Sequence, residues 1–202
     1  MKKSQNYIDF MKNKLKILGV IPARLAASRF PNKPLKKITN LTMLEHVYER
    51  AKLSKTLDYL TIATCDKEIY NFSKKRNYNV IMTSNKHVRA LDRVYEASKK
   101  LSQKFKLKSK DLTICIQADE PMLDPKMIDK SIIFLKKNNN AKCTILGMKI
   151  NNKKQFNDKN ILKIAHNLNK EVLYTSRSPI PYCKNFSKKI NVKRIYGIFA
   201  FR

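Results

Sequence analysis

The chain of 202 residues is long enough to bury a substantial apolar core without disulfides or structural metals. Its formal net charge of +29 at pH 7 raises the question of nucleic-acid binding. Lysine is spread over every segment, however, whereas the surfaces with which proteins recognise bases and bind nucleic-acid phosphates favour clustered arginine. We therefore expect no specific nucleic-acid partner, and only non-specific attraction to polyanions at low salt.

Cysteine spacing and hydropathy exclude further classes of protein. The four cysteines lie far apart, so the sequence contains neither a paired-cysteine metal knuckle nor a redox pair. No stretch approaches the roughly 20 apolar residues of a membrane span, and residues 1–14 form a polar extension unlike a signal peptide. The expectation is a cytoplasmic protein with no membrane partner.

The first apolar run, residues 17–21, is rich in β-branched side chains and predicts a strand buried on both faces. We expect this strand to end at Pro22, because proline cannot extend a sheet ladder. Three cations and a hydroxyl follow in the next loop, at Arg24, Ser28, Arg29 and Lys33. Solvated surface charge would explain any one of them, but their clustering just past a strand favours an anion site for phosphates. No glycine-rich phosphate loop is present, so side chains would hold the phosphates.

The later segments alternate between helical and strand patterns. Helices are predicted over residues 43–53, 68–76, 87–105 and 125–135, the last one capped by Asp124. Strands are predicted over residues 59–64, 80–82, 112–117 and 143–148, and a hairpin from 161–164 and 172–174 after a polar excursion over 151–160. This alternation predicts a three-layer α/β fold with a mostly parallel central sheet. We expect a single domain over residues 15–202, with a small subdomain from about residue 150.

A second informative segment, residues 117–121 (QADEP), directly follows the strand predicted over 112–117. A carboxylate at the end of a central strand lies at the edge of the sheet where ligands bind, so Asp119 is placed to hold Mg²⁺ together with substrate phosphates. The alternative is a loop acid that only caps the following turn. Two such loops converging in one fold favour the metal site.

Three segments together resemble one enzyme family. Residues 22–35 resemble P-A-R-x-x-S-x-R-x-P-x-K-P-L, with Ser28 and Arg29 at the S-x-R place in a slightly shifted spacing. Residues 117–121 resemble Q-x-D-E-P, and residues 173–182 (LYTSRSPIPY) resemble Y-F-S-R-x-P-I-P-Y. These are signatures of the sugar-activating cytidylyltransferases, and they are most similar to those of the 3-deoxy-manno-octulosonate (Kdo) cytidylyltransferase (CMP-Kdo synthetase) family.

The resemblance implies a Rossmann-like nucleotide-diphospho-sugar transferase fold and a homodimer. It implies a nucleotidyltransferase that joins CTP to a 2-keto sugar acid, first of all Kdo, for lipopolysaccharide or surface-polysaccharide synthesis. The residues it assigns to catalysis are Lys33, Arg24 and Asp119, with Asp119 as the Mg²⁺ ligand. The residues it assigns to the nucleotide are Arg24, Ser28, Arg29, Lys33, His87 and Arg93, with a helix-cap role as the alternative for His87 and Arg93. The residues it assigns to the sugar are Gln117, Tyr174 and Arg177, where the planar guanidinium of Arg177 can bind a carboxylate through two parallel hydrogen bonds.

The chain also departs from the Kdo pattern. Residues 87–93 (HVRALDR) keep the histidine, an acid and the final arginine of H-x-S-G-T-E-R but lack its Ser-Gly-Thr, and residues 91–97 are similar to the spore-coat-polysaccharide type. Ile195 stands where the family has a histidine associated with the sugar site. Family members continue into a tail with a second metal-binding aspartate, which we expect this chain to lack. Transfer to another sugar or to glycerol- or choline-type phosphates, and an inactive truncated homologue that binds nucleotides or polyanions, stay open as alternatives.

Overall fold

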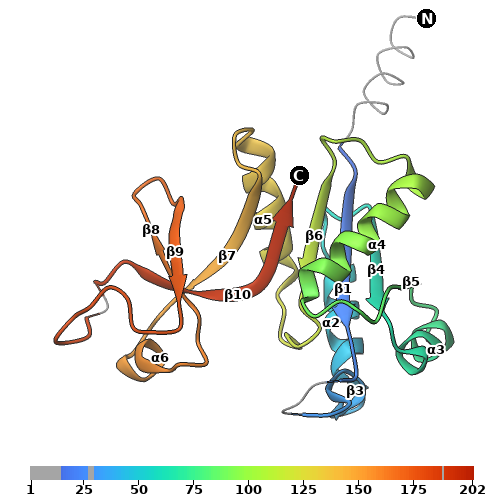
Figure 1. Cartoon of the computed structure of the whole chain (residues 1–202), viewed down its shortest axis with the longest axis horizontal. Helices are drawn as coiled ribbons and strands as arrows, with labels where there is room; N and C mark the ends of the chain where they lie inside the picture. The colour runs from blue at the N-terminus through green and yellow to red at the C-terminus, as the bar shows by residue number, and fades with distance from the viewer. Residues whose placement is uncertain (1–14, 27–29, 188) are drawn as a thin grey trace, which may run out of the picture. The chain divides into compact units, whose positions relative to one another are not determined.

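The computed structural model describes residues 15–26, 30–187 and 189–202 (Figure 1). The chain divides into two compact units, which we call unit 1 (Met1–Thr144 with Ile198–Arg202) and unit 2 (Ile145–Gly197). The sequence-based division into one domain with a small subdomain from about residue 150 stays a prediction. In the part of the chain that the structure describes, no helix combines the length and the apolar character needed to cross a membrane.

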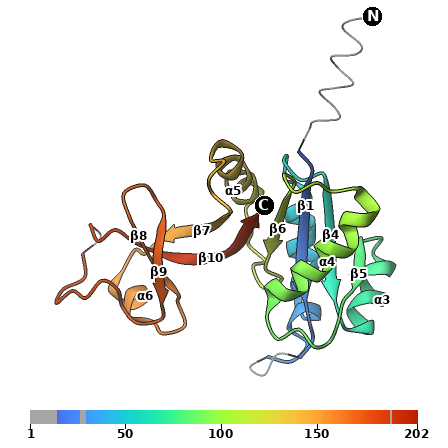
Figure 2. The same ribbon diagram turned by 45° about the horizontal axis from the view of Figure 1, so that its top comes forward.

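Unit 1 is built on parallel strands in the order β5-β4-β1-β6 (Figure 2). The central strand β1 (Ile17–Ala23) is buried along its whole length and pairs with β4 (Tyr59–Thr64) and β6 (Leu112–Ile116). β5 (Val80–Met82) pairs with β4, and the end of β10 (Val192–Phe201) adds to β6 in the antiparallel sense. The predicted mostly parallel sheet is confirmed.

Strand β1 continues through Pro22, so the predicted end at this residue is wrong. Pro22 lies opposite Ala63 in the parallel register with β4. The main-chain N–H and carbonyl groups of successive strand residues point alternately to the two neighbouring strands. Pro22 and Lys16 are an even number of residues apart, so their main-chain groups point to the same side. That side is the β6 side, because the Lys16 carbonyl accepts from the N–H of Leu112 in β6. The pairing with β6 ends at Val20. The missing N–H of the proline therefore faces a side where the ladder has already ended, which costs no hydrogen bond.

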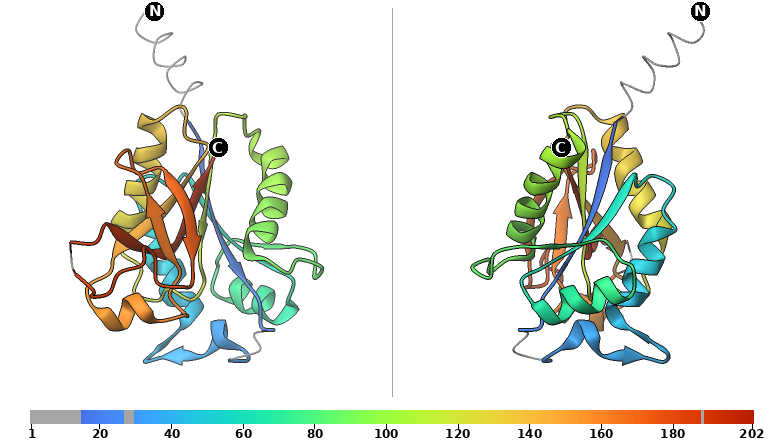
Figure 3. Two further views of the ribbon diagram at one scale, coloured as in Figure 1. Left: turned by 60° about the vertical axis from the view of Figure 1, so that its left-hand side comes forward. Right: turned by 90° about the vertical axis from the view of Figure 1, so that its right-hand side faces the viewer.

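Helices cover both faces of these strands, which gives the three layers that the sequence predicts (Figure 3). Helix α4 (Ala90–Phe105) lies on one face, and α2 (Met43–Lys52) and α5 (Pro125–Lys137) lie on the other. Helix α3 (Lys67–Lys75) contacts β4 and β5. The side chain of Asp124 caps α5 as predicted, because it accepts from the Lys126 N–H at 2.9 Å.

Helix α4 begins three residues later than the predicted start at His87. Arg89 at its N-cap has extended backbone, with φ −103° and ψ 146°. The prediction counted Val88 on the buried face, but this side chain is 81% exposed. The helix packs on the strands through Val94, Ala97 and Leu101. His87 therefore lies in a loop at the end of the sheet rather than on the helix.

The remaining predicted helices and strands of unit 1 are found within two residues of their expected bounds. Three short elements were not predicted: a 3-10 helix η1 (Lys33–Leu35), and strands β2 (Lys37–Ile38) and β3 (Leu41–Thr42), which pair with each other. Turn-sized elements of two or three residues are too short to show a hydrophobic period.

Unit 2 contains the predicted hairpin, formed by β8 (Lys163–His166) and β9 (Val172–Ser176). β8 also pairs with β10, as does β7 (Cys143–Lys149). A short helix, α6 (Lys153–Asn157), lies within the polar excursion predicted over residues 151–160, and this helix was not itself predicted. Phe156, which is 2% exposed, packs with other apolar residues of unit 2. One aromatic residue in a polar stretch gives no period from which to predict a helix.

Candidate functional site

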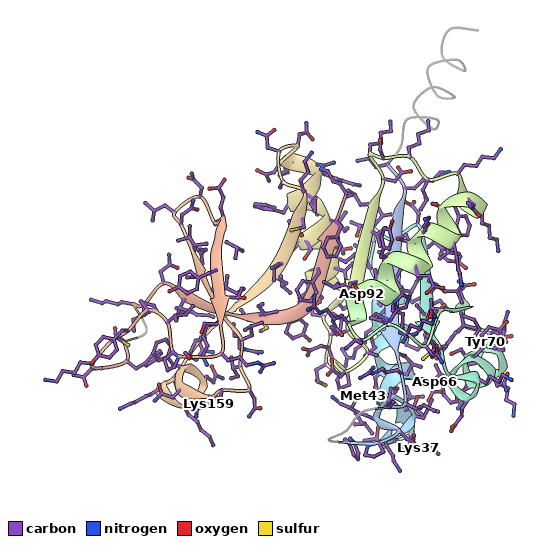
Figure 4. All side chains as sticks on the ribbon, in the orientation of Figure 1. Lys37, Met43, Asp66, Tyr70, Asp92 and Lys159 are labelled. Atoms are coloured by element: carbon purple, nitrogen blue, oxygen red, sulfur yellow. The ribbon has the colours of Figure 1, made fainter. Side chains whose placement is uncertain are left out.

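A cavity of about 280 Å³ lies in unit 1 at the carboxyl ends of the parallel strands. Its lining comes from the end of β1, from η1, from the β5–α4 loop with the start of α4, and from the residues after β6. Met43, at the start of α2, also contributes and is labelled in Figure 4. Every predicted site residue that the structure describes in unit 1 lines this cavity: Arg24, Lys33, His87, Arg93, Gln117 and Asp119. Ser28 and Arg29 lie outside the described residues.

The loops after β1 and β6 meet at an ion pair. The Lys33 Nζ lies 3.1 Å from the Asp119 Oδ2. Pro34, next to Lys33 in η1, is buried and anchors this turn. The side chains of Lys33 and Asp119 are 33% and 55% exposed, and ion pairs this accessible are worth only about 0–1 kcal/mol. The ion pair can therefore break at little cost in free energy, and each side chain can then bind a charged group of a ligand.

Asp66, which the sequence reasoning missed, anchors the start of the loop that carries Arg24. It occupies the N-cap position of α3 without capping that helix, and its Oδ2 accepts from the Leu25 N–H at 2.8 Å. The Leu25 carbonyl in turn accepts from the Asn32 N–H at 3.2 Å. Both the N–H and the carbonyl of Leu25 are therefore held by hydrogen bonds, in the loop that connects Arg24 to Lys33. The available signal was the position of Asp66, labelled in Figure 4, just after β4, since Asp119 likewise follows the carboxyl end of a parallel strand of the same sheet.

Arg93 places a buried positive charge in the lining of the cavity. It is 2% exposed, and its Nη1 donates to the Thr83 Oγ1 at 2.5 Å and to the Ser84 carbonyl at 3.3 Å. Within residues 15–26, 30–187 and 189–202 it forms no ion pair with a carboxylate. A guanidinium that no acid neutralises keeps the potential at this wall positive, which favours an anionic ligand.

Glu96 ties the β5–α4 loop to helix α4. Its carboxylate binds His87 Nε2, Lys100 Nζ at 2.6 Å and the Ser84 N–H at 2.9 Å. Burial by itself would raise the pKa of Glu96, but the hydrogen bonds from Lys100, Ser84 and His87 outweigh it and lower the pKa to about 2. Glu96 is therefore ionised at neutral pH, and it holds His87 at the cavity.

Gln117 is half-buried, and its amide nitrogen lies 3.9 Å from the Cys115 Sγ. Burial raises the pKa of the Cys115 thiol to about 12, so this cysteine stays protonated and is not a nucleophile at neutral pH. Gln117 lines the cavity, where a side-chain amide can donate to or accept from a bound ligand.

The two remaining predicted residues, Tyr174 and Arg177, belong to unit 2. Tyr174 lies on β9 and is 53% exposed. Arg177 directly follows β9, and its Nη1 donates to the carbonyls of Lys159 at 3.1 Å and Asn160 at 3.3 Å. The roles assigned to both residues stay predictions.

Asp119, the one acid in the described lining of the cavity, fits one kind of metal site. Among the described residues there is no cluster of three histidine, cysteine or acidic side chains, so a closed metal site of protein ligands is not formed there. Asp119 offers a single exposed carboxylate beside the cations. Mg²⁺ is commonly held by one or two carboxylates together with substrate phosphates. The donor set therefore fits a magnesium ion that arrives with a polyphosphate.

Known proteins that are similar to this chain include cytidylyltransferases. The family model for cytidylyltransferases matches residues 18–202. The 3-deoxy-manno-octulosonate cytidylyltransferase of Thermodesulfovibrio yellowstonii is 39% identical over 188 residues, covering 90% of this chain and 73% of that protein. The 8-amino-3,8-dideoxy-manno-octulosonate cytidylyltransferase of Shewanella sp. (strain W3-18-1) is 36% identical, covering 93% of this chain and 75% of that protein.

Among solved structures, CMP:2-keto-3-deoxy-manno-octonic acid synthetase in complex with CTP matches with a TM-score of 0.82 and 32% identity. The match covers 93% of this chain and 74% of that chain. Sequence and fold thus agree with those of cytidylyltransferases over nearly the whole length of the chain. The chain belongs to the cytidylyltransferase family.

Proposed function

We propose that this protein activates Kdo with CTP, giving CMP-Kdo and pyrophosphate. The observation that carries the proposal is the Lys33–Asp119 pair, which joins the cationic loop after β1 to the acidic loop after β6 at one cavity. The relatives named as Kdo cytidylyltransferases and the structural likeness to a synthetase bound to CTP support it. A nucleotidyltransferase needs such a cavity, because its substrate carries a compact cluster of negative charge.

The reaction is a displacement at phosphorus. The oxygen of the anomeric hydroxyl forms a bond to the α-phosphorus of CTP, and the bond from that phosphorus to the bridging oxygen breaks. Pyrophosphate leaves with the electron pair, and the hydroxyl proton passes to solvent. Such a step depends mainly on alignment and on neutralisation of developing charge.

The residues of the cavity divide these tasks. Arg24 and Lys33, with Arg29 and Ser28 of the same loop, would bind the triphosphate and stabilise the leaving pyrophosphate. Asp119 would hold a magnesium ion, which when bound neutralises charge on the phosphate oxygens. His87 and Arg93 would contact the nucleotide. The sequence resemblance implies sugar-acid roles for Gln117 of unit 1 and for Tyr174 and Arg177 of unit 2, with Arg177 as the partner of the carboxylate.

The proposal is tested by removing each half of the ion pair. We expect Lys33→Ala and Asp119→Ala each to lower pyrophosphate release from CTP and Kdo by about 100-fold or more, because each removes charge that stabilises the transition state. The matched control is Lys37→Ala, which removes an exposed lysine from β2. Near-normal turnover in both site variants would overturn the assignment. Tight CTP binding without any turnover in the unaltered protein would instead favour the inactive nucleotide-binding homologue.

A second candidate sugar is favoured by one comparison, since a Shewanella relative of similar identity is named for the 8-amino-3,8-dideoxy sugar. Pyrophosphate release measured with Kdo, its 8-amino analogue and glycerol phosphate ranks the three acceptors by kcat/KM. We expect Kdo to rank first. A higher kcat/KM for either other acceptor would reassign the substrate.

We also infer a cytoplasmic homodimer. Exposed apolar side chains of the β8–β9 hairpin in unit 2 support an interface with a second copy, among them Leu168 (94% exposed) and Leu173 (63% exposed). The four free cysteines support a reducing compartment. Light scattering coupled to size-exclusion chromatography should give twice the chain mass, and a monomer at micromolar concentration would contradict the dimer.

A further inference from the structure

Unit 2 contains a buried lysine that the proposed reaction leaves unexplained. Lys163, the first residue of β8, is 0% exposed. Its Nζ donates to the carbonyl of Asp158 at 2.5 Å and to the carbonyl of Arg177 at 2.8 Å. Burying an ammonium group is costly unless its hydrogen bonds are made, and burial lowers the pKa of Lys163. An apolar side chain would fill this space without that cost, so the charge serves to hold the two carbonyls.

The side chain of Arg177 is held by the same turn. Its Nη1 donates to the carbonyls of Lys159 and Asn160, which follow Asp158 directly. Lys163 lies opposite Ser176 in the β8–β9 register, so its ammonium reaches the next residue along the chain, Arg177. The main chain and the guanidinium of Arg177 are thus fixed by one turn and one buried charge.

This arrangement leaves one edge of the guanidinium available. Across the described residues, the hydrogen bonds of the Arg177 side chain all come from Nη1, and none comes from Nε or Nη2. The edge formed by two such nitrogens matches a carboxylate, with two parallel hydrogen bonds. Arg177 is exposed, so a ligand can reach this edge.

We propose that Lys163 is a positioning residue for sugar-acid recognition: its buried ammonium holds the main chain of Arg177 so that the free guanidinium edge faces the substrate carboxylate. This inference rests on the proposed function. Lys163 touches no substrate and acts only through Arg177.

The test compares the effect of a Lys163 substitution on the KM for Kdo with its effect on the KM for CTP. Lys163→Met keeps an unbranched side chain, shorter by the terminal atom, and removes its charge. We expect the KM for Kdo to rise about tenfold or more, since a small displacement of an orienting group is costly, while the KM for CTP changes less than twofold. The matched control, Lys154→Met, removes an exposed lysine of α6 and should leave both constants unchanged. A purely structural role would lower the melting temperature and the active fraction with the KM for Kdo unchanged, and would overturn the proposal.

A double-mutant cycle tests whether Lys163 acts through Arg177. If it does, Lys163→Met combined with Arg177→Gln should be no worse in KM for Kdo than Arg177→Gln alone. Additive effects would contradict the coupling. Should Lys163→Met fail to fold, Lys163→Gln keeps a neutral donor and takes its place in the cycle.

Hydrogen exchange distinguishes this inference from the proposed function. If the unaltered protein releases no pyrophosphate from CTP and Kdo, the proposed function fails. Hydrogen exchange still reports whether Lys163 holds the main chain of Asp158 and Arg177. Peptides covering residues 158–160 and 176–178 should then lose protection in Lys163→Met and not in Lys154→Met. Unchanged protection would overturn the role of Lys163.

Discussion

At the scale of single residues, the site depends on acids and bases whose partners are main-chain groups. Asp66 holds the Leu25 N–H, and Lys163 holds the Arg177 carbonyl. Each of these charged groups sets the position of a neighbouring cation that a ligand would meet. Because a hydrogen bond to a charged group is stronger than one between neutral groups, each contact can restrain the main chain of a loop.

Asp66 offers a direct test of this view. We expect Asp66→Ala to raise the KM for CTP about tenfold, because the Leu25 N–H loses its acceptor and the loop that carries Arg24 and Lys33 is no longer held. Asp66→Asn keeps an acceptor oxygen and should stay within about threefold of the unaltered protein. Glu68→Ala, an exposed acid in the first turn of the same helix, is the control. Equal kinetics for all variants would show that the contact does not position the loop.

At the scale of elements, the β5–α4 loop joins a strand to a helix through one carboxylate. Glu96 on α4 accepts from groups in that loop and from Lys100 one turn further on. The loop is thereby fixed at the wall of the cavity although it contains no regular structure. Its position should therefore depend on the ionisation of Glu96.

Acid should weaken this link in a defined range of pH. The pKa of Glu96 is lowered from the ordinary 4.5 to about 2 in the folded protein. The resulting stability is present above pH 4.5 and is lost as the pH falls from 4.5 towards 2, amounting to roughly 3 kcal/mol at most. Glu96→Gln should lower the free energy of unfolding at pH 7 and flatten its decline in this range. Urea unfolding at several pH values measures both effects.

The control for this experiment is Glu68→Gln, which removes an exposed carboxylate from α3. This variant should keep the decline in stability between pH 4.5 and 2. A Glu96→Gln variant whose stability falls as steeply as that of the unaltered protein would contradict the role of Glu96.

The elements themselves were largely predictable from sequence. Strands β4 and β5 match their expected bounds, since each is a short apolar run between polar residues. The start of α4 was misplaced because Val88 fits the helical period yet lies exposed in a loop. The end of β1 was predicted too early, at Pro22. Proline is unfavourable in a strand that is paired on both sides, but the pairing of β1 with β6 has already ended at Val20.

At the scale of the whole molecule, the predictable part of the site is the part that lies in contiguous motifs. Arg24, Lys33, Gln117 and Asp119 were found because each follows a strand whose carboxyl end could be recognised. Asp66 and Lys163 were not, because their roles depend on partners 41 and 14 residues away. Local patterns carry no information about such partners, and only the folded chain brings them together.

The Lys33–Asp119 pair has a thermodynamic consequence for ligand uptake. An anion that binds Lys33 alone separates it from Asp119 and leaves a carboxylate facing the newcomer's negative charge. A cation that binds Asp119 alone likewise leaves the Lys33 ammonium without its partner and facing another positive charge. A nucleotide and a divalent ion that enter together satisfy both, so saturation with either should lower the dissociation constant of the other by an equal factor.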